Sequence, residues 1–452
     1  MINLEAPVAD AGWNQTESPF HEGEQDAQTR LGIREKVESI GRRFIRDYMP
    51  DQHREFYASL PFLLIGTTDQ QGWPWASMIV ARPGFVSSPN SRSLQVTARP
   101  LFGSPLQTTL SSGRHLGVLG FQPENRRRNR LTGRVGAINA DGFEILVDQS
   151  FGNCPQYIQT RAIEYLPEID TPERERPIHR SDHLDEVARV LISSADTLFI
   201  ATAYPAEASH HPASHLAYGA DVSHRGGKPG FVKIEDDKTF IFPDFPGNLF
   251  FNTVGNLLIN PKAGFLFIDF ERGDLLYLRC EAAVIWSGPA VAAFASAERF
   301  LRFHVVEVIR VEQSLPLRFT FGEYSPTLER TGSWEEVAKI LAQPSTVSPM
   351  PGSPMEKPVN VCFAQSGIET EWTPDQGTLL ELAESVDIKA PFSCRQGHCG
   401  ACATQILCGT ADYIRSTKGP HQADEVLICS ATPRSISGEE TCSEDMGIVL
   451  NL

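Results

Sequence analysis

The sequence predicts a mainly β protein with some helices, in which two similar barrels precede a smaller C-terminal domain. Short strand-like runs, separated by Gly, Pro, Asn and Asp, dominate the chain up to about residue 311 and favour antiparallel barrels over a parallel sheet. Several runs recur in the same order, which indicates a tandem duplication. A proline-rich stretch then precedes a cysteine-rich part, so the 452 residues are expected to form several domains.

The composition limits the classes of partner. A formal net charge of -16 argues against binding to nucleic acid or to anionic membranes, because both need a positive face. The sequence shows neither a secretory signal nor an apolar run of about 18 residues, so a cytoplasmic protein is expected. Its nine cysteines are odd in number and do not suggest a disulfide framework, so their thiols are available to bind metal.

The elements are expected in a definite order along the chain. Residues 1–34 are polar and look like an N-terminal arm, and apolar residues at helical spacing between 31 and 60 predict two helices interrupted by Pro50. The first strands are expected at 62–69, 75–86, 93–98, 115–121 and 134–149. A helix with a Ser cap is expected at 181–196, followed by a strand at 197–203.

The two halves share sequence features at matching places. "ARPGFV" (81–86) matches "GKPGFV" (227–232), and "HLGVLGFQ" (115–122) lies at nearly the same offset as "KAGFLFID" (262–269). "FLLIGTTD" (62–69) and "LFIATA" (198–203) open the two halves, which makes three matches in one order and predicts two copies of one barrel. The expected domains after the arm are a first repeat at 35–175, a second repeat at 176–343, a Pro-rich linker at 344–358 and a C-terminal domain at 359–452.

Four cysteines of the C-terminal domain have the spacing of an iron-sulfur site. The expected ligands are Cys394, Cys399, Cys402 and, after 26 intervening residues, Cys429. This C-x4-C-x2-C…C order is that of plant-type ferredoxins, in which four thiolates hold a 2Fe-2S cluster. Gly397 and Gly400 would let the backbone wrap closely around it. A structural zinc site is the alternative, although zinc sites usually combine two C-x2-C pairs.

The residues around these cysteines extend the pattern. "VNVCF" (359–363) and "ETEW" (369–372) suggest a hairpin, and "TLLELAESV" (378–386) suggests a helix, which is the order of a β-grasp domain. Residues 359–452 resemble the 2Fe-2S ferredoxin family, especially ferredoxin modules fused to oxygenase reductases. They contain 13 Asp and Glu against 5 Lys and Arg, a net charge of -8. This charge either steers the domain to a basic partner or is simply a soluble acidic surface.

The tandem repeats resemble a second family. No G-x-G-x-x-G motif follows a strand, so no dinucleotide-binding βαβ unit is predicted. The stretches "GADVSHRGGKPGFV", "FPDFPGNLFFNTVGNLLINPKAGFLFIDF", "RRRNRLTGRV" and "FGNCPQYIQTR" resemble the pyridoxamine 5'-phosphate oxidase-like, FMN-binding split-barrel family over about residues 35–340. The resemblance implies tandem FMN-binding split barrels.

The same resemblance implies which residues bind FMN. It points to a basic pair on one strand, a flavin-binding turn, and a segment that closes over the phosphate and ribityl chain. These residues are Lys228 and Lys233 for the pair, Ser223, Arg225, Gly226 and Gly227 for the turn, and Asn248, Asn252, Thr253 and Asn256 for the segment. The family has an Arg-Lys pair where this chain has Asn252 and Thr253, and this departure weakens the phosphate assignment and any claim to vitamin B6 chemistry.

Other polar residues have two interpretations each. Arg127 and Arg128, within "NRRRNR" (125–130), are expected to hold FMN or a substrate phosphate from the opposing repeat; a solvated hairpin is the alternative. Cys154 is expected to be a buried structural thiol rather than a redox group. Packed thiols are expected at Cys362 and Cys408, and exposed side chains rather than metal ligands at His210, His211 and His215.

The leading functional hypothesis is an FMN and 2Fe-2S oxidoreductase that passes electrons between NAD(P)H, FMN, the cluster and an external acceptor such as an oxygenase. In the alternative, a separate reductase feeds the ferredoxin domain, and FMN acts on a small anionic molecule. A flavin-binding redox sensor is the third hypothesis. Because split barrels usually pair to complete the flavin site, a homodimer is also expected.

Overall fold

The computed structural model describes residues 12–169, 174–205, 215–342, 358–386, 388, 390–392, 397, 400–414, 417, 420–434 and 447–452. The chain divides into two compact units, each described here by itself. The first contains Met1–Gln28 and Arg34–Leu341, and the second contains Thr29–Ile33 and Ala342–Leu452. Apart from its last residue, the expected linker at 344–358 lies outside the described residues.

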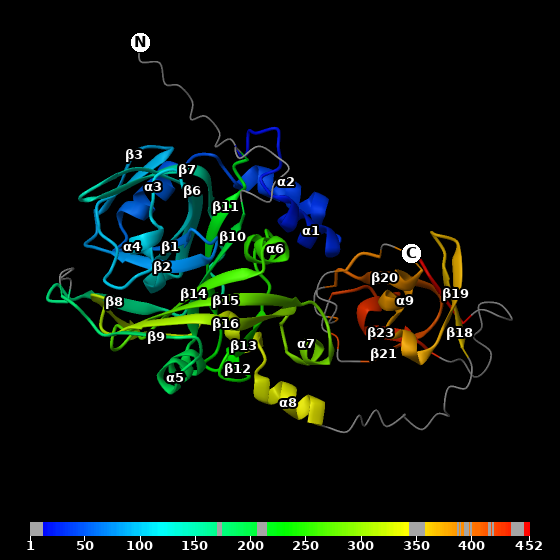
Figure 1. Ribbon diagram of the computed structural model, residues 1–452. Coiled ribbons are helices and arrows are strands. Elements are labelled where there is room, and N and C mark those ends of the chain that lie inside the picture. The colour runs from blue at the N-terminus through cyan, green and yellow to red at the C-terminus, as the bar shows by residue number, and fades with distance from the viewer. Residues whose placement is uncertain are drawn as a thin grey trace, which may run out of the picture. The chain divides into compact units, whose positions relative to one another are not determined.

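The first repeat forms a seven-stranded antiparallel sheet with the strand order β2-β1-β5-β6-β7-β4-β3 (Figure 1). Its strands are β1 (Phe62–Thr68), β2 (Pro74–Val80), β3 (Val86–Asn90), β4 (Ser93–Val96), β5 (His115–Gln122), β6 (Arg127–Asn139) and β7 (Gly142–Gly152). The helices of this part are α1 (Glu22–Arg30), α2 (Arg34–Phe44), α3 (Asp51–Ala58) and α4 (Leu106–Thr109).

The second repeat forms an eight-stranded sheet with the order β11-β10-β14-β15-β16-β13-β12, in which β9 also pairs with β16. Its strands are β9 (Ile178–Ser181), β10 (Thr197–Tyr204), β11 (Gly219–Gly226), β12 (Lys233–Ile234), β13 (Thr239–Asp244), β14 (Lys262–Ile268), β15 (Leu275–Ile285) and β16 (Arg299–Val311). Its helices are α5 (Glu186–Ser194), α6 (Asn252–Ile259), α7 (Pro289–Ala293) and α8 (Trp334–Ala342). A separate two-stranded sheet pairs β8 (Arg161–Tyr165) with β17 (Leu317–Phe321).

The two large sheets have the same topology, because β1 to β7 correspond in order to β10 to β16. Helix α4 lies between β4 and β5 as α6 lies between β13 and β14. Within the described residues each path ends at an edge strand instead of closing into a continuous barrel. The prediction of a mainly β, tandem split-barrel fold is confirmed.

Some local expectations were wrong. The run at 134–149 forms two strands, because Asn139 accepts hydrogen bonds from the backbone of Asp141 and Gly142 and closes a turn. The helix expected at 181–196 begins at Glu186, since the side chain of Asp185, rather than a serine, accepts the cap bond from the Ala188 backbone at 2.8 Å. None of the helices in the described part of the chain has the length and apolar character needed to cross a membrane.

The two repeats touch through glycines that bring backbones together. A Cβ atom at Gly117 of β5 would lie 2.6 Å from the carbonyl oxygen of Ala220 on β11. At the corresponding place in the second repeat, a Cβ at Gly264 of β14 would lie 2.1 Å from the carbonyl oxygen of Pro74 on β2. The two contacts are therefore equivalent, and the repeats are related by an approximate two-fold axis.

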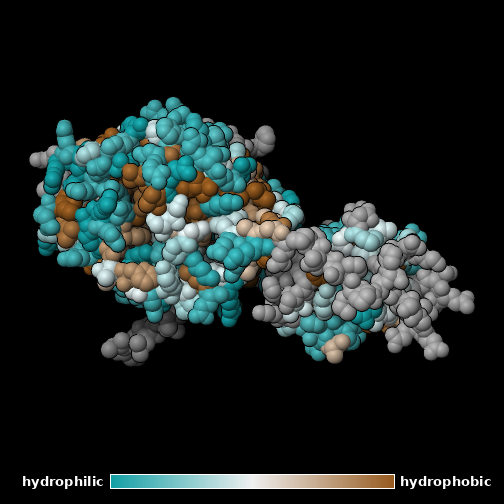
Figure 2. Space-filling view, turned by 90° about the horizontal axis from the view of Figure 1, so that it is seen from below, coloured by the Kyte–Doolittle hydropathy of each residue, from teal (hydrophilic) through white to brown (hydrophobic). Residues whose placement is uncertain are grey.

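Apolar side chains form four clusters among the described residues of this unit, one of them packed around α7 and α8. One core lies within the first repeat and another within the second. The fourth is shared by both repeats and includes Phe62, Trp75, Phe199 and Tyr277. On the face shown in Figure 2, hydrophilic residues surround a band of hydrophobic ones. The shared core and the glycine contacts fix the repeats as one body.

The second unit has a mixed five-stranded sheet with the order β19-β18-β24-β20-β22. The strands are β18 (Val359–Phe363), β19 (Ile368–Trp372), β20 (Ala403–Gly409), β22 (Glu425–Leu427) and β24 (Ile448–Leu450), and β21 (Ala411–Tyr413) pairs with β23 (Ala431–Pro433). Helix α9 (Leu379–Ser385) begins with a capping box between Thr378 and Glu381 and packs on the core. A sheet with one such helix agrees with the expected β-grasp domain.

We expect Gly264→Ala to lower the melting temperature by about 4 °C or more, because the added methyl group would force the two backbones apart at a cost of about 2 kcal/mol. Thermal unfolding followed by circular dichroism measures the effect. Gly152→Ala is the matched control, since a Cβ there meets nothing closer than 3.7 Å. Equal melting temperatures for the two variants would contradict the proposed role of the contact.

Candidate functional site

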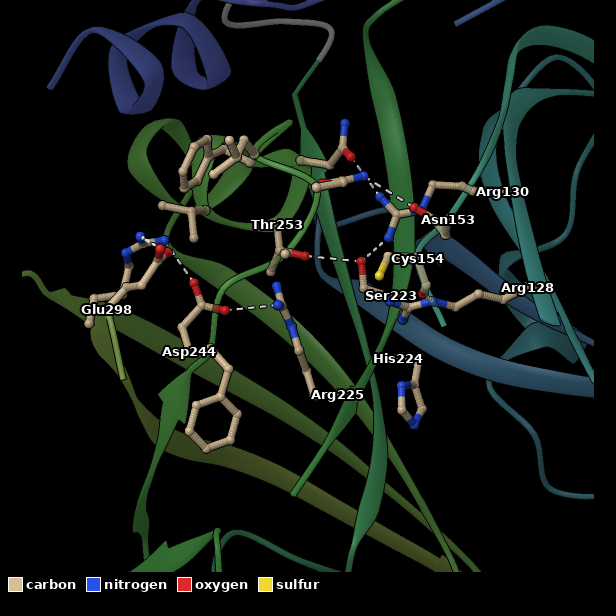
Figure 3. A pocket seen from close by; sticks show the side chains of 18 residues that line it. Arg128, Arg130, Asn153, Cys154, Ser223, His224, Arg225, Asp244, Thr253 and Glu298 are labelled. Carbon is tan, nitrogen blue, oxygen red and sulfur yellow. Dashed lines mark hydrogen bonds and ion pairs between the residues drawn. The ribbon is translucent and has the colours of Figure 1, made fainter. Parts of the chain in front are cut away.

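A pocket lies between the two repeats in the first unit (Figure 3). The first repeat contributes residues from the start of β6 and the end of β7, and the second contributes β11, the end of β13, the first turn of α6 and the start of β16. The lining residues are Arg128, Arg130, Asn153, Cys154, Ser223, His224, Arg225, Asp244, Phe245, Gly247, Asn248, Leu249, Phe251, Asn252, Thr253, Val254, Glu298 and Arg299. The pocket therefore needs both repeats.

Strand geometry brings the polar side chains together. Arg128 and Arg130 are two residues apart on β6, and Ser223 and Arg225 are two apart on β11, so each pair lies on one side of its strand. The Arg130 guanidinium donates to Ser223 Oγ and, at 2.9 Å, to Asn252 Oδ1. These bonds connect β6 of one repeat to β11 and α6 of the other.

A carboxylate between two arginines forms the other side of the pocket. Asp244 accepts a hydrogen bond from Arg225 and one from Arg299, each at 2.8 Å (Figure 3). Arg299 is only 1% exposed and also donates to Glu298 at 2.6 Å. Such charge-assisted bonds hold the guanidinium groups in fixed positions.

The pocket has an excess of positive charge. Four arginines and two carboxylates line it, a difference of two positive charges. Burial, followed by the charges of Arg130 and Arg225, lowers the pKa of Arg128 to about 9. The Nε atoms of Arg130, Arg225 and Arg299 are buried without a hydrogen-bond partner. An anion would satisfy these donors and offset the repulsion between the arginines.

Helix α6 adds backbone donors at the same place. Its N-cap, Phe251, has the left-handed φ of 64° and provides no side-chain cap. The first turn, Asn252 to Val254, lines the pocket. Because the first N-H groups of a helix lack partners within the helix, they favour an anion in front of them.

His224 is a neutral imidazole in the wall of the pocket. Its ring is stacked on Phe121, and both ring nitrogens are buried without a hydrogen-bond partner. Burial, followed by the charges of Arg128 and Arg225, holds its pKa well below the usual value. The imidazole can therefore donate or accept one hydrogen bond toward a ligand without carrying charge.

A smaller adjoining pocket shares Arg128, His224 and Arg225 with the first. Three of its other lining residues are aromatic, namely Tyr157, Phe231 and Phe245, and the ring centroids of Tyr157 and Phe245 are 5.2 Å apart. Together the two pockets offer cations and hydroxyl groups at one end and flat apolar surfaces at the other.

The structure brings together only some of the residues expected to bind FMN. Those that line the main pocket are Arg128, Ser223, Arg225, Asn248, Asn252 and Thr253. Gly226 lines the adjoining pocket. The others, Arg127, Gly227, Lys228, Lys233 and Asn256, line neither.

The residues outside the pockets have other contacts. Lys228 donates to the carbonyl oxygen of Thr331 at 2.7 Å, and Lys233 lies over the ring of Trp334. Arg127 lies over the ring of Phe56. Lys228 therefore attaches the loop after β11 to the segment that leads into α8, and Lys233 attaches the start of β12 to the first residue of α8.

Sequence reasoning missed two arginines of the pocket. Arg130 could have been found, because it lies in the quoted "NRRRNR" run two residues beyond Arg128, on the same side of a strand. Nothing in the local sequence marks Arg299, which enters the pocket from β16.

Two expectations about other polar residues need correction. Cys154 is half-buried and lines the pocket, so it is not a fully buried structural thiol. His215 is half-buried and stacks on Tyr218, because the chain folds back there before β11; it is not exposed. His210 and His211 lie outside the described residues.

The cysteine site of the second unit is described in part. Cys402 and Cys429 are buried, whereas Cys394 and Cys399 lie outside the described residues. The Gly397 backbone N-H donates to Cys429 Sγ at 3.3 Å. A Cβ at Gly397, whose φ is 68°, would lie 2.5 Å from Thr417 Cγ2. Close backbone approach and an N-H directed at sulfur fit a thiolate-bound cluster.

The two further cysteines of this unit differ from each other. Cys362 is a free, half-buried thiol on β18. Cys408 is disulfide-bonded, so the expectation of a packed thiol was wrong there.

Comparison with known proteins identifies the second unit. Residues 363–434 match the model of the 2Fe-2S iron-sulfur cluster binding domain. A similar protein is the 3-ketosteroid-9-alpha-monooxygenase, ferredoxin reductase component, of Mycolicibacterium smegmatis: 42% identical over 79 residues, which are 17% of this chain and 22% of that protein. Another is the phthalate 4,5-dioxygenase oxygenase reductase subunit of Pseudomonas putida: 31% identical over 80 residues, 18% of this chain and 24% of that protein.

The chain spans only about a fifth of the length of these relatives. Among solved structures, a putative pyridoxamine 5'-phosphate oxidase from Lactobacillus delbrueckii matches with a TM-score of 0.21 and 12% identity, over 28% of this chain and 94% of that one. A TM-score this low does not establish a common fold. The comparisons therefore show that the second unit is similar to the 2Fe-2S domains of electron-transfer proteins.

We expect Asp244→Asn to destabilise the first unit by about 3 kcal/mol, because it leaves the buried Arg299 with less negative charge to offset it. Urea unfolding of the full chain measures this loss. Glu335→Gln is the control, since it removes an exposed ion pair with Lys339 and should have no measurable effect. The same unfolding midpoint in both variants would show that Asp244 does not compensate the buried arginine.

Proposed function

We propose that the protein is an FMN and 2Fe-2S oxidoreductase that passes electrons between NAD(P)H, FMN, the iron-sulfur cluster and an external acceptor such as an oxygenase. The observation that carries this proposal is the cationic pocket between the repeats, in a chain that also has a 2Fe-2S domain. Bound FMN would exchange two electrons with a nicotinamide and single electrons with the cluster.

The donor set of the pocket fits a flavin phosphate. A phosphate dianion needs cations and hydrogen-bond donors, and Arg130, Arg225 and Arg299 each have a buried Nε without a partner. The hydroxyl groups of Ser223 on β11 and Thr253 on α6 are 3.1 Å apart and add to the donors of the pocket. The adjoining aromatic pocket would hold a flat ring system.

The two repeats are not equivalent in this respect, which supports a single flavin site per chain. Aligning "ARPGFV" with "GKPGFV" places Ile79 of β2 where β11 has Arg225. The registers of β5 with β6 and of β14 with β15 place Tyr277 where β6 has Arg130. Ile79 and Tyr277 are fully buried in apolar cores, so the place related by the two-fold axis has neither cation.

The ferredoxin domain supplies the second cofactor in this proposal. We assign Cys394, Cys399, Cys402 and Cys429 as the ligands of its 2Fe-2S cluster. The support is the match of residues 363–434 to the cluster-binding domain and the burial of the two cysteines that the structure describes. Lys228 and Lys233 are not part of the proposed FMN site, because other groups hold them.

The direct test is an ultraviolet-visible titration of the anaerobically purified protein with NADH and with NADPH. Flavin and cluster absorption that both bleach would support the proposed electron path. Cofactors that bleach only when a separate ferredoxin reductase is added would favour the alternative direction of flow. A protein that binds iron and sulfide but no flavin would overturn the proposal.

We expect FMN to bind with a stoichiometry of about one per chain, and Arg225→Met to raise its dissociation constant about 10–100-fold, because a charge-assisted bond to the phosphate is lost. Flavin fluorescence quenching measures both quantities. The control is Arg180→Met, since Arg180 pairs with Glu307 on the surface. Two flavins per chain, or equal affinities of the two variants, would be incompatible with the assigned site.

We expect Gly397→Ala to lower the iron content of the purified protein several-fold, because the methyl group would collide with Thr417 and disturb the N-H bond to Cys429. Gly367→Ala is the matched control: its φ of 66° is nearly the same, but nothing lies within 4 Å of its Cβ position. FMN binding should be unchanged in both. Full iron content in Gly397→Ala would refute the proposed close wrapping of the cluster.

A further inference from the structure

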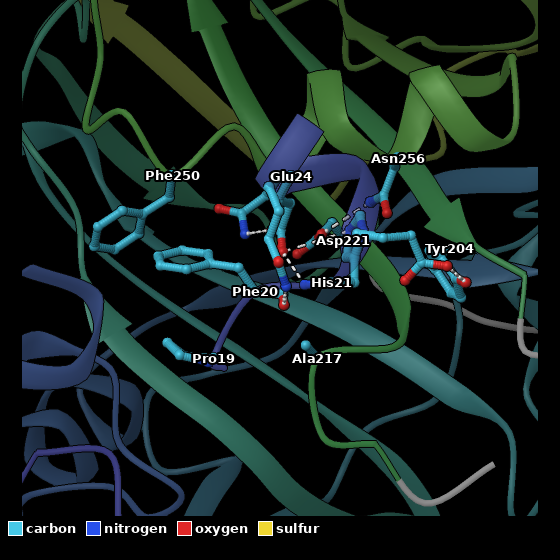
Figure 4. Close-up of polar contacts among 12 residues, drawn as sticks. Pro19, Phe20, His21, Glu24, Tyr204, Ala217, Asp221, Phe250 and Asn256 are labelled. Atoms are coloured by element: carbon cyan, nitrogen blue, oxygen red, sulfur yellow. Dashed lines mark hydrogen bonds and ion pairs between the residues drawn. The ribbon is translucent and has the colours of Figure 1, made fainter. Parts of the chain in front are cut away.

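A buried polar cluster lies behind the pocket, where α1 packs on β11 and α6 (Figure 4). Glu24 of α1 and Asp221 of β11 are its carboxylates, 2% and 7% exposed. Asp221 Oδ1 lies 3.6 Å from the Arg130 guanidinium, and its Oδ2 accepts from Asn256 at 3.0 Å. Glu24 accepts from the side chain of Asn252 and, at 2.9 Å, from the backbone of His21.

Backbone contacts fix the place of Glu24. A Cβ at Gly255 of α6 would lie 2.5 Å from the backbone nitrogen of Glu24, and a Cβ at Gly23 would lie 2.3 Å from the carbonyl oxygen of Gly255. Helix α1 therefore lies directly on α6. Through Asn252, which lines the pocket, Glu24 is one hydrogen-bonded step from the proposed phosphate site.

The cluster is not neutral when all its acids are ionised. It has two carboxylates and one guanidinium, because His21 is uncharged: burial lowers its pKa to about 3, although the neighbouring Asn256 side chain opposes this. Burial, then the charge of Asp221, raises the pKa of Glu24 well above its usual value. Burial also raises the pKa of Asp221, against the opposing effect of Arg130. Burial and mutual repulsion therefore favour states in which the pair binds a proton.

The other groups around the cluster do not change this balance. Arg225 acts on Arg130 from β11, and the buried Tyr57, whose pKa is raised, stays neutral. His215 acts on His21 in the direction that keeps it uncharged. Glu22 is hydrogen-bonded to Tyr204. Arg130 is thus the cation that the cluster and the pocket share.

We propose that binding of a phosphate group in the pocket is coupled to uptake of a proton from solvent by the Glu24–Asp221 pair. Arg130 compensates Asp221 in the free protein, lines the pocket, and has a buried Nε without a partner. An anion beside Arg130 adds negative potential at both carboxylates, so a carboxylate oxygen binds a further proton. Glu24 and Asp221 are positioning residues that keep the local charge constant. This inference rests on the proposed function, because the phosphate is that of FMN.

The test is isothermal titration calorimetry of the flavin-free full chain with FMN at pH 8, in buffers of different ionisation enthalpy. At this pH the phosphate, with a second pKa of about 6, is already a dianion and releases no proton itself. We expect uptake of about one proton per FMN. Riboflavin, which lacks the phosphate, should bind with almost no uptake.

Two variants test whether the Glu24–Asp221 pair, rather than another group of the protein, takes up the proton. The double variant Glu24→Gln, Asp221→Asn should bind FMN without uptake, whereas Glu22→Gln should behave as the unaltered chain. If the double variant does not fold, the comparison of FMN with riboflavin decides. FMN binding without uptake, or equal uptake with riboflavin, would overturn the inference and leave the proposed function intact. If FMN does not bind, the proposed function fails. Inorganic phosphate is then the probe, and phosphate binding without proton uptake would overturn the proposed coupling as well.

Discussion

The close contact of the two sheets at glycines is the constraint on which the rest of the first unit depends. Gly117 packs on β11 and Gly264 packs on β2 with no room for a side chain. This contact sets the distance between the repeats and brings the start of β6 next to β11. The arginines of both repeats can then face one pocket, which neither sheet could build alone.

The pocket concentrates charge at a place where burial makes charge costly. Buried cations persist in a folded protein only if carboxylates or ligands offset them, and Asp244, Glu298 and Asp221 do this for Arg225, Arg299 and Arg130. The remaining unpaired Nε atoms are a local cost to stability, and an anion would remove that cost. The donors are held rigidly by their carboxylates, so little rearrangement is needed when a ligand enters.

Much of the fold could be predicted because local patterns indicate it, namely short strands, repeated motifs and the cysteine spacing. The pocket was harder, because tertiary pairing assembles it. Ser223, Arg225 and Thr253 were found through resemblance, whereas Lys228 and Lys233 have partners that no local pattern reveals.

The buried polar cluster around Glu24 and Asp221 was the part of the structure that the sequence predicted least. Residues 12–30 are polar enough to look like an arm, yet His21, Glu24 and Gln28 are buried against the second repeat. A buried polar group looks like a surface group in sequence, since its partners come from distant segments. For the same reason, the charge of "NRRRNR" could be noticed, whereas the pairing of Arg130 with Asp221 could not.

The joining of both repeats in one chain has an evolutionary consequence. In a symmetric homodimer each mutation appears twice, so a change that fills one cavity also fills its twin. Here the two copies are encoded separately, and β2 could acquire Ile79 and β15 Tyr277 while β11 kept Arg225. Because the two halves are encoded separately, one of the two places related by the two-fold axis can be filled by apolar packing while the other binds a ligand.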